Sequence, residues 1–186
     1  LAFDRRVDLR TGVLTRTVVW RAKPAGPVVE LRFERLISPA DPHQAAVRLT
    51  VNAAQDARLR IRAGFDSYVD NTGLVHWTPV TQEAGEDTSL LVARTRSTGI
   101  EVALACAVDV VGALAGGEAC DADRSPASDL RLDLPAGRAV TVAKYVAIVP
   151  DFDDPAARRT APELADRMRR TGWEGWRAAS DAAWRQ

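Results

Sequence analysis

Ala57-Arg58-Leu59-Arg60-Ile61-Arg62-Ala63 decides the fold class of this chain, because apolar and charged side chains alternate along it without interruption. Side chains with a period of two point to opposite faces of a β-strand, so the three arginines share one face. We therefore expect a half-buried strand whose arginine face lies in water.

The same alternation recurs along the first four-fifths of the chain. It predicts strands over residues 29–33, 47–51 and 100–108, and apolar runs between turn signals predict further strands over residues 7–9, 13–20, 89–95, 130–134 and 140–149. Many short strands at about ten-residue spacing indicate a sandwich. The predicted fold class is mainly β: a large antiparallel β-sandwich followed by C-terminal linker helices.

One of these strands has an unusual second face. Ala103, Ala105 and Ala107 lie opposite Val102, Leu104 and Cys106 in the alternation. Small apolar residues on the second face predict that it is also covered and that the strand is central in its sheet.

The pattern changes to a helical period after Pro150. Thr160 and Glu163 have the spacing of a capping box, and Gly172 is a helix-ending signal. We therefore divide the chain into a sandwich domain, residues 1–150, and a helical linker, residues 151–186. Trp173, Trp176 and Trp184 recur at about one turn, and we expect this stripe to be an exposed docking patch for a missing partner.

Composition excludes several classes of protein. The 186 residues carry 25 basic and 25 acidic side chains, and no block of like charge suits nucleic acid. No apolar run approaches the roughly 20 residues that span a bilayer. Two cysteines do not make a disulfide framework, so we expect a reducing compartment and a cytoplasmic protein without membrane contact.

Candidate catalytic residues do not emerge from the sequence. The acids lie in turns, Cys106 is expected in the core, and His43 is expected to be a hydrogen-bonded structural residue. Neither histidine has metal-ligand spacing, so we predict no catalytic residue and no metal site. His76 and Trp77 are the weak candidates for carbohydrate binding, because an exposed aromatic ring can stack on a sugar.

Several short motifs, in the correct order, resemble the N-terminal domain of family 65 glycoside hydrolases, which include maltose, trehalose and kojibiose phosphorylases. The motifs cover nearly the whole chain: residues 8–16, 34–38, His43, residues 46–48, 63–66, Asn71, residues 94–100, 135–137, Lys144 and Trp184. Ser180 departs from the pattern, which has a histidine four residues before that tryptophan.

The resemblance implies a galactose-mutarotase-like supersandwich joined to an (α/α)6 catalytic barrel outside these residues. The full-length protein would be a glycosyl hydrolase or an inverting phosphorylase acting on α-linked glucose disaccharides, whereas these residues would be inactive. Inorganic phosphate would be a co-substrate if the full-length protein is a phosphorylase, and no cofactor is implied. The implied partners are the protein's own barrel, a second copy in a homodimer, and an α-glucoside disaccharide.

Two alternatives come from other classes. An independent carbohydrate-binding module would expose aromatic rings, with Trp20, Tyr68 and Trp77 as candidates. A mutarotase-like epimerase would need a histidine and a carboxylate that face one cleft.

Overall fold

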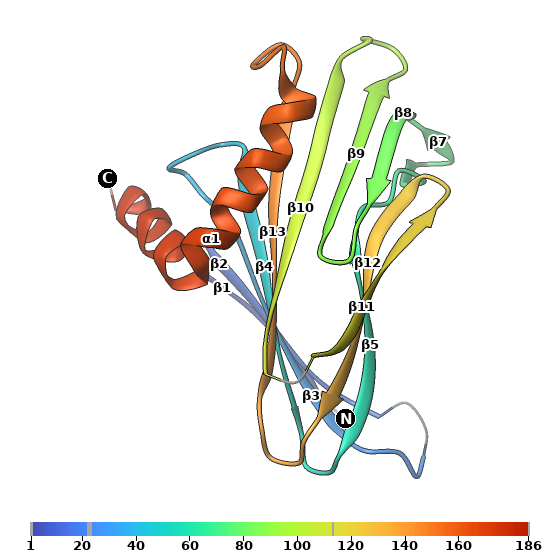
Figure 1. Ribbon diagram of the computed structural model, residues 1–186. Helices are drawn as coiled ribbons and strands as arrows, with labels where there is room; N and C mark the ends of the chain where they lie inside the picture. Colours follow the sequence, from blue (N-terminus) through green and yellow to red (C-terminus); the bar gives the residue numbers. More distant parts are fainter. Residues whose placement is uncertain (1, 22–23, 113, 186) are drawn as a thin grey trace.

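The computed structural model describes residues 2–21, 24–112 and 114–185, and it arranges them in three layers (Figure 1). A large antiparallel sheet lies in the middle, helix α1 covers one face, and a smaller sheet covers part of the other. The elements are β1 Ala2–Asp8, β2 Val13–Trp20, β3 Val29–Ile37, β4 Gln44–Ala53, β5 Ala57–Gly64, β6 Asp70–Asn71, β7 Leu74–Val75, β8 Trp77–Ala84, β9 Thr88–Thr95, β10 Glu101–Val111, β11 Leu114–Ala122, β12 Ser125–Leu134, β13 Val140–Pro150 and α1 Ala157–Trp184.

The sandwich is uneven. The large sheet has eight strands in the order β1-β2-β3-β4-β13-β10-β9-β8, and the small sheet has three in the order β11-β12-β5. Every pair of neighbouring strands is antiparallel. The predicted antiparallel β-sandwich is therefore confirmed, with most of its strands in one sheet.

The core between the sheets comes from the alternating residues predicted to face inward. It contains Val51, Val108, Leu130, Leu132 and Val140, each at most 3% exposed. On the outer side of β5, Arg58, Arg60 and Arg62 have 92%, 62% and 54% of their side chains exposed. The sequence placed both faces of this strand correctly.

The alanine face of β10 is covered, as predicted. Ala103, Ala105 and Ala107 are each at most 1% exposed and pack in one cluster with Ala161 and Ala165 of α1. Small side chains on both elements allow the helix to lie close to the sheet. Strand β10 lies between β13 and β9, so its predicted central position is confirmed.

The helical segment differs from its prediction at its start. The helix begins at Ala157 without a side-chain capping hydrogen bond, so the capping box of Thr160 and Glu163 is wrong. The Asp154 side chain instead accepts from the Ala156 amide at 2.8 Å. Gly172, with φ 74° and ψ 164°, interrupts the helix, and a second helical stretch follows it, as predicted.

The tryptophan stripe is not the exposed patch that we expected. Trp173 and Trp176 are 7% and 5% exposed and pack with Tyr145 against the large sheet, so only Trp184, at 43%, remains exposed. The Trp176 Nε1 donates to Gln44 Oε1 at 2.6 Å. The partner of this stripe is the sheet of the same chain.

Four strands were missed: the two-residue strands β6 and β7, and the longer strands β8 and β11. Strand β8 contains Pro79, and its ladder with β9 is irregular between Pro79 and Thr81. Strand β11 contains Gly116 and Gly117, which together resemble a flexible connection in sequence. Proline and glycine interrupt the alternation of apolar and polar residues that predicts a strand. These segments form strands because a neighbouring strand pairs with them.

Candidate functional site

The predicted sugar-binding residues lie near one end of the small sheet. His76 is exposed between β7 and β8, and Trp77 is half-buried at the start of β8. Tyr68, from the loop before β6, is 49% exposed. Arg124, from the turn between β11 and β12, contacts both Trp77 and Tyr68. Its guanidinium donates to the Trp77 carbonyl at 3.0 Å and lies 4.6 Å from the Tyr68 ring centroid.

Tyr68 is fixed on one side and open on the other. Its hydroxyl donates to Asp123 Oδ2 at 2.6 Å, which raises the pKa of the phenol. Its backbone amide donates to Asp66 Oδ1 at 2.8 Å. A ring held in place before a ligand arrives loses little conformational entropy on binding, so this cluster can act as a stacking platform. Trp20, the third aromatic candidate, is 41% exposed on β2 and belongs to the other sheet.

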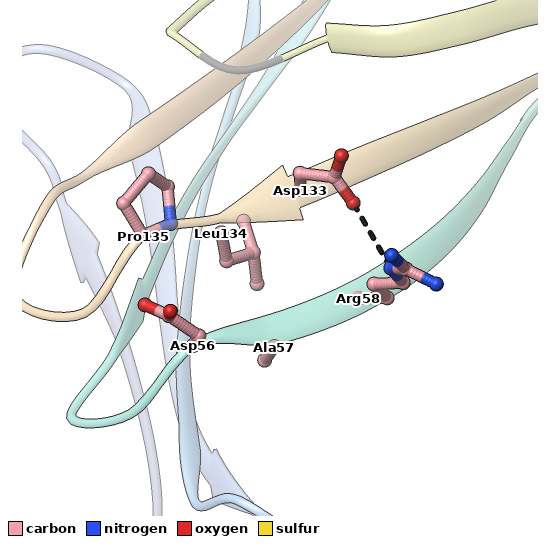
Figure 2. Close-up of a pocket in the computed structure, with 6 residues that line it drawn as sticks. All are labelled: Asp56, Ala57, Arg58, Asp133, Leu134 and Pro135. Atoms are coloured by element: carbon pink, nitrogen blue, oxygen red, sulfur yellow. Dashed lines mark ion pairs between the residues drawn. The ribbon is translucent and has the colours of Figure 1, made fainter.

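The hollow shown in Figure 2 lies where β5 begins and β12 ends, and its volume is about 370 Å³. Asp56, Arg58 and Asp133 line it, together with Ala57, Leu134 and Pro135. Arg58 Nε lies 3.3 Å from Asp133 Oδ1, and Asp56 accepts from the Ala136 amide at 2.8 Å. Both carboxylates are thus already engaged, and the hollow contains no aromatic ring on which a sugar could stack.

A second hollow, of about 330 Å³, brings a histidine and a carboxylate together. His43 Nε2 lies 3.7 Å from Asp153 Oδ2, and the lining also includes Ile37, Ala45 and Ile148. His43 Nδ1 is 2.9 Å from the Ile148 carbonyl, which confirms the predicted hydrogen-bonded role. At 3.7 Å the two side chains are not hydrogen-bonded to each other, and one ring nitrogen of His43 is already engaged by the backbone.

Two carboxylates on the strands are held in the ionised form by arginines. Asp129 is 2% exposed and accepts from Arg62 at 2.8 and 2.7 Å and from Arg60 at 2.5 Å, which holds its pKa well below the usual range. Arg158 and, more weakly, Arg94 lower the pKa of Glu101. A general acid needs a raised pKa, whereas the pKa values of Asp129 and Glu101 are lowered.

A third carboxylate fastens α1 to the large sheet. Glu34 is 4% exposed, and Arg48 Nε donates to its Oε2 at 2.8 Å. Arg48 also donates to Glu174 of α1 at 2.7 Å and lies 4.5 Å from the Trp173 ring centroid. Arg177 reaches Glu34 at 3.6 Å. These contacts join β3, β4 and α1, so Glu34 has a structural role.

In the described part of the chain, Lys144 and Cys106 make their polar contacts with groups other than carboxylates. Lys144 Nζ donates to the Gly64 carbonyl and lies 4.5 Å from the Phe65 ring centroid, and burial lowers its pKa. Cys106 is 2% exposed, as predicted, and its Sγ is 3.1 Å from Ser89 Oγ. Within residues 2–21, 24–112 and 114–185, no three His, Cys, Asp or Glu side chains are grouped as metal ligands.

Sequence reasoning missed Arg124 and Asp129. Arg124 is 56 residues from Tyr68 and has φ 59°, a conformation that its sequence neighbours did not suggest. Asp129 lies directly opposite Arg62 in the ladder of β12 and β5. The pairing of distant strands brings Arg124 to Tyr68 and Asp129 to Arg62. Local sequence patterns do not reveal this pairing.

These features define the class of the molecule as a helix-backed, uneven antiparallel β-sandwich domain. The chain belongs to glycosyl hydrolase family 65, because the model of the family's N-terminal domain matches residues 1–186. The chain is 28% identical, over 102 residues, to a kojibiose phosphorylase of Halothermothrix orenii, a match that covers 54% of this chain and 13% of that protein.

A solved structure shares the fold. It is assigned as a kojibiose phosphorylase from the human microbiome, and it aligns with a TM-score of 0.81 at 16% identity over 98% of this chain and 24% of its own. The chain therefore spans a quarter or less of the relatives that it matches. No helix in the described part of the chain is both long and apolar enough to cross a membrane.

Proposed function

We propose that this chain is the non-catalytic domain of a full-length enzyme that cleaves α-linked glucose disaccharides, and that it supports the catalytic barrel. The observation that carries the proposal is the state of its buried and half-buried carboxylates. Asp129 and Glu101 have lowered pKa values and are bound by arginines. Glu34 is also bound by arginines, and it holds α1 on the sheet.

The similarity to kojibiose phosphorylases favours phosphorolysis over hydrolysis for the whole protein. In that reaction a carboxylic acid of the barrel would protonate the glycosidic oxygen while inorganic phosphate attacks the anomeric carbon with inversion. The domain would also contribute to a homodimer. Two free cysteines, Cys106 and Cys120, fit a reducing compartment such as the cytoplasm.

The test compares the 186-residue chain with the full-length gene product on kojibiose, maltose, trehalose and nigerose, with and without phosphate. We expect cleavage by the full-length protein alone, and release of glucose 1-phosphate only when phosphate is present. Cleavage by the 186-residue chain would refute the non-catalytic role. Cleavage that does not depend on phosphate would instead indicate a hydrolase.

A second candidate function, carbohydrate binding, is favoured by the fixed ring of Tyr68. Calorimetric titration of the chain with maltotriose and kojibiotriose, with cellotriose for comparison, measures it. Tyr68→Ala should abolish a signal that Trp20→Ala, the matched exposed aromatic, leaves intact. Equal binding by both variants would remove Tyr68 as the platform.

A further inference from the structure

A basic surface without acids extends across β1, β2 and β3, on the side of the large sheet where the small sheet packs. We call it the basic face, and it consists of Phe3, Arg5, Leu14, Arg16, Phe33 and Arg35, which line a hollow of about 110 Å³. Arg5 lies directly opposite Arg16 in the ladder, Arg16 opposite Phe33, and Leu14 opposite Arg35. The three guanidinium groups therefore belong to one side of three adjacent strands.

These arginines lack counter-charges, unlike most others in the chain. Among the described residues, no carboxylate lies within 4.0 Å of Arg5, Arg16 or Arg35. The acids of the same strands, Asp4, Asp8, Glu30 and Glu34, alternate with them and so lie on the other side of the sheet. Like charges directly opposite one another destabilise a strand pair. The described residues therefore provide no acidic group that would neutralise the three arginines of this face.

The best-defined member of the face is Arg16. Its guanidinium lies 4.3 Å from the Phe33 ring centroid, and its Nε is buried without a hydrogen-bond partner. A buried donor without an acceptor costs free energy, because it has lost water and gained nothing in exchange. An incoming carboxylate next to this guanidinium would remove that cost.

The surroundings of the arginines are apolar. Phe3 is 66% exposed and Val7 56%, both on the edge strand β1, and Ile37 is 71% exposed at the end of β3. On the same side of β3, Leu31 and Phe33 pack partly on the core between the sheets. The basic face is thus an uncovered continuation of the sandwich interior, which is typical of a protein interface and not of a site for a free ion.

Two observations select the occupant. A second copy that packed face to face would bring six arginines together and supply no acid, so self-association through this surface is disfavoured. The end of α1 lies at the turn between β1 and β2, because Trp184 Nε1 donates to the Leu9 carbonyl there at 2.9 Å (Figure 1). This turn borders the basic face, although α1 itself covers the opposite side of the sheet. In a protein as long as its relatives, the chain after α1 would start there.

We propose that the basic face binds an acidic, partly apolar surface of the catalytic part of the same polypeptide. This inference rests on the proposed function, since it gives the supported barrel a place to dock. The carboxylates of that surface would pair with Arg5, Arg16 and Arg35, while Phe3 and Ile37 would be covered by its apolar side chains.

The test measures modification of individual arginines by phenylglyoxal, read by mass spectrometry, in the full-length protein and in the 186-residue chain. We expect Arg5, Arg16 and Arg35 to react about tenfold more slowly in the full-length protein, because they react only when the interface opens. Arg58, which is 92% exposed on the small sheet, is the internal control and should react equally in both. Arg5→Glu should remove the protection of Arg35, whereas Arg58→Glu should not.

The outcomes separate this inference from the proposed function. Equal reactivity of the three arginines in both proteins would overturn the docking face, even if the full-length protein cleaves disaccharides. Protection in a full-length protein that cleaves no disaccharide would support the docking face and refute the proposed activity. Protection that grows with protein concentration would show that a second copy is the occupant, and would also overturn the inference.

Discussion

The two halves of α1 pack on the same sheet by opposite means. Residues 157–171 approach β10 closely, with Ala161 and Ala165 against Ala105 and Ala147. Residues 173–184 pack on the sheet through large side chains, with Trp173 and Trp176 against Tyr145. The packing of the first half therefore requires small side chains, whereas the packing of the second half requires large ones.

The difference follows from the shape of the sheet and the break in the helix. A twisted sheet turns away beneath a straight helix, so one helix axis cannot stay close to all of its strands. Gly172 redirects the chain, and the second half of α1 runs towards β1 and β2 (Figure 1). Tyr145 beneath the tryptophans is 1% exposed, and burial raises its pKa to about 12.

The largest effect should come from removing volume in the second half. Trp176→Ala removes a ring that is 5% exposed together with its hydrogen bond to Gln44, and should lower the free energy of unfolding by about 3–5 kcal/mol. Chemical denaturation of the 186-residue chain measures this loss. Trp184→Ala, at 43% exposure, should cost clearly less, and equal losses would contradict the packing described.

Adding volume should break the first half. Ala161 is fully buried against the sheet, and Ala161→Leu should lower the free energy of unfolding by about 3 kcal/mol through overpacking. Amide hydrogen exchange should show faster exchange in residues 157–171 than in the wild type. Ala182→Leu, at an exposed position of the same helix, is the control and should leave exchange unchanged.

The break between the halves gives a smaller effect. Gly172→Ala places a side chain at φ 74° and ψ 164°, a conformation reserved for glycine, and should cost about 2 kcal/mol. No atom lies within 4 Å of the added Cβ, so the whole loss would come from the backbone. Thermal unfolding measures it. Gly175→Ala, in a helical conformation, should cost less than Gly172→Ala, because only the exposed Thr171 side chain, whose Cγ2 lies 3.1 Å from the added Cβ, has to shift.

The smallest effect concerns the ion pair at the rim of the first half. Arg158 holds the pKa of Glu101 below its ordinary value, and the two groups lie 2.7 Å apart. Because the folded state has the lower pKa, the stabilisation is fully present above pH 4.5 and is lost as the pH falls through the folded pKa. The stability difference between wild type and Glu101→Gln, about 1 kcal/mol at pH 7, should shrink below pH 4.5. A difference independent of pH would contradict the pairing.

The sequence predicted the first half of α1 better than the second for a physical reason. Ala103, Ala105 and Ala107 alternate with larger residues, and only a close neighbour explains small side chains on an apolar face. Tryptophans at helical spacing show that one face is buried, but the spacing does not identify what buries it. The pattern alone could not distinguish the chain's own sheet from another domain, and we assigned the wrong surface.

The candidate site was less predictable than the fold. Tyr68 and Trp77 were chosen as aromatic residues near turns, and the structure places both beside Arg124. That contact depends on the left-handed backbone of Arg124 and on the register of β11 with β12. Interactions between residues far apart in sequence leave no local pattern, whereas alternation along a strand does.

The hydrogen bond between Trp184 and Leu9 joins residues 175 positions apart, and it constrains how the chain can fold during synthesis. A ribosome adds about 5–20 residues per second, so β1 and β2 are made many seconds before the helix end that closes over their turn. During that interval the hairpin has only its own ladder to hold it, and its outer edge is open to pairing with other chains. The nascent domain is therefore most vulnerable to aggregation at its first strand and until its last residues emerge.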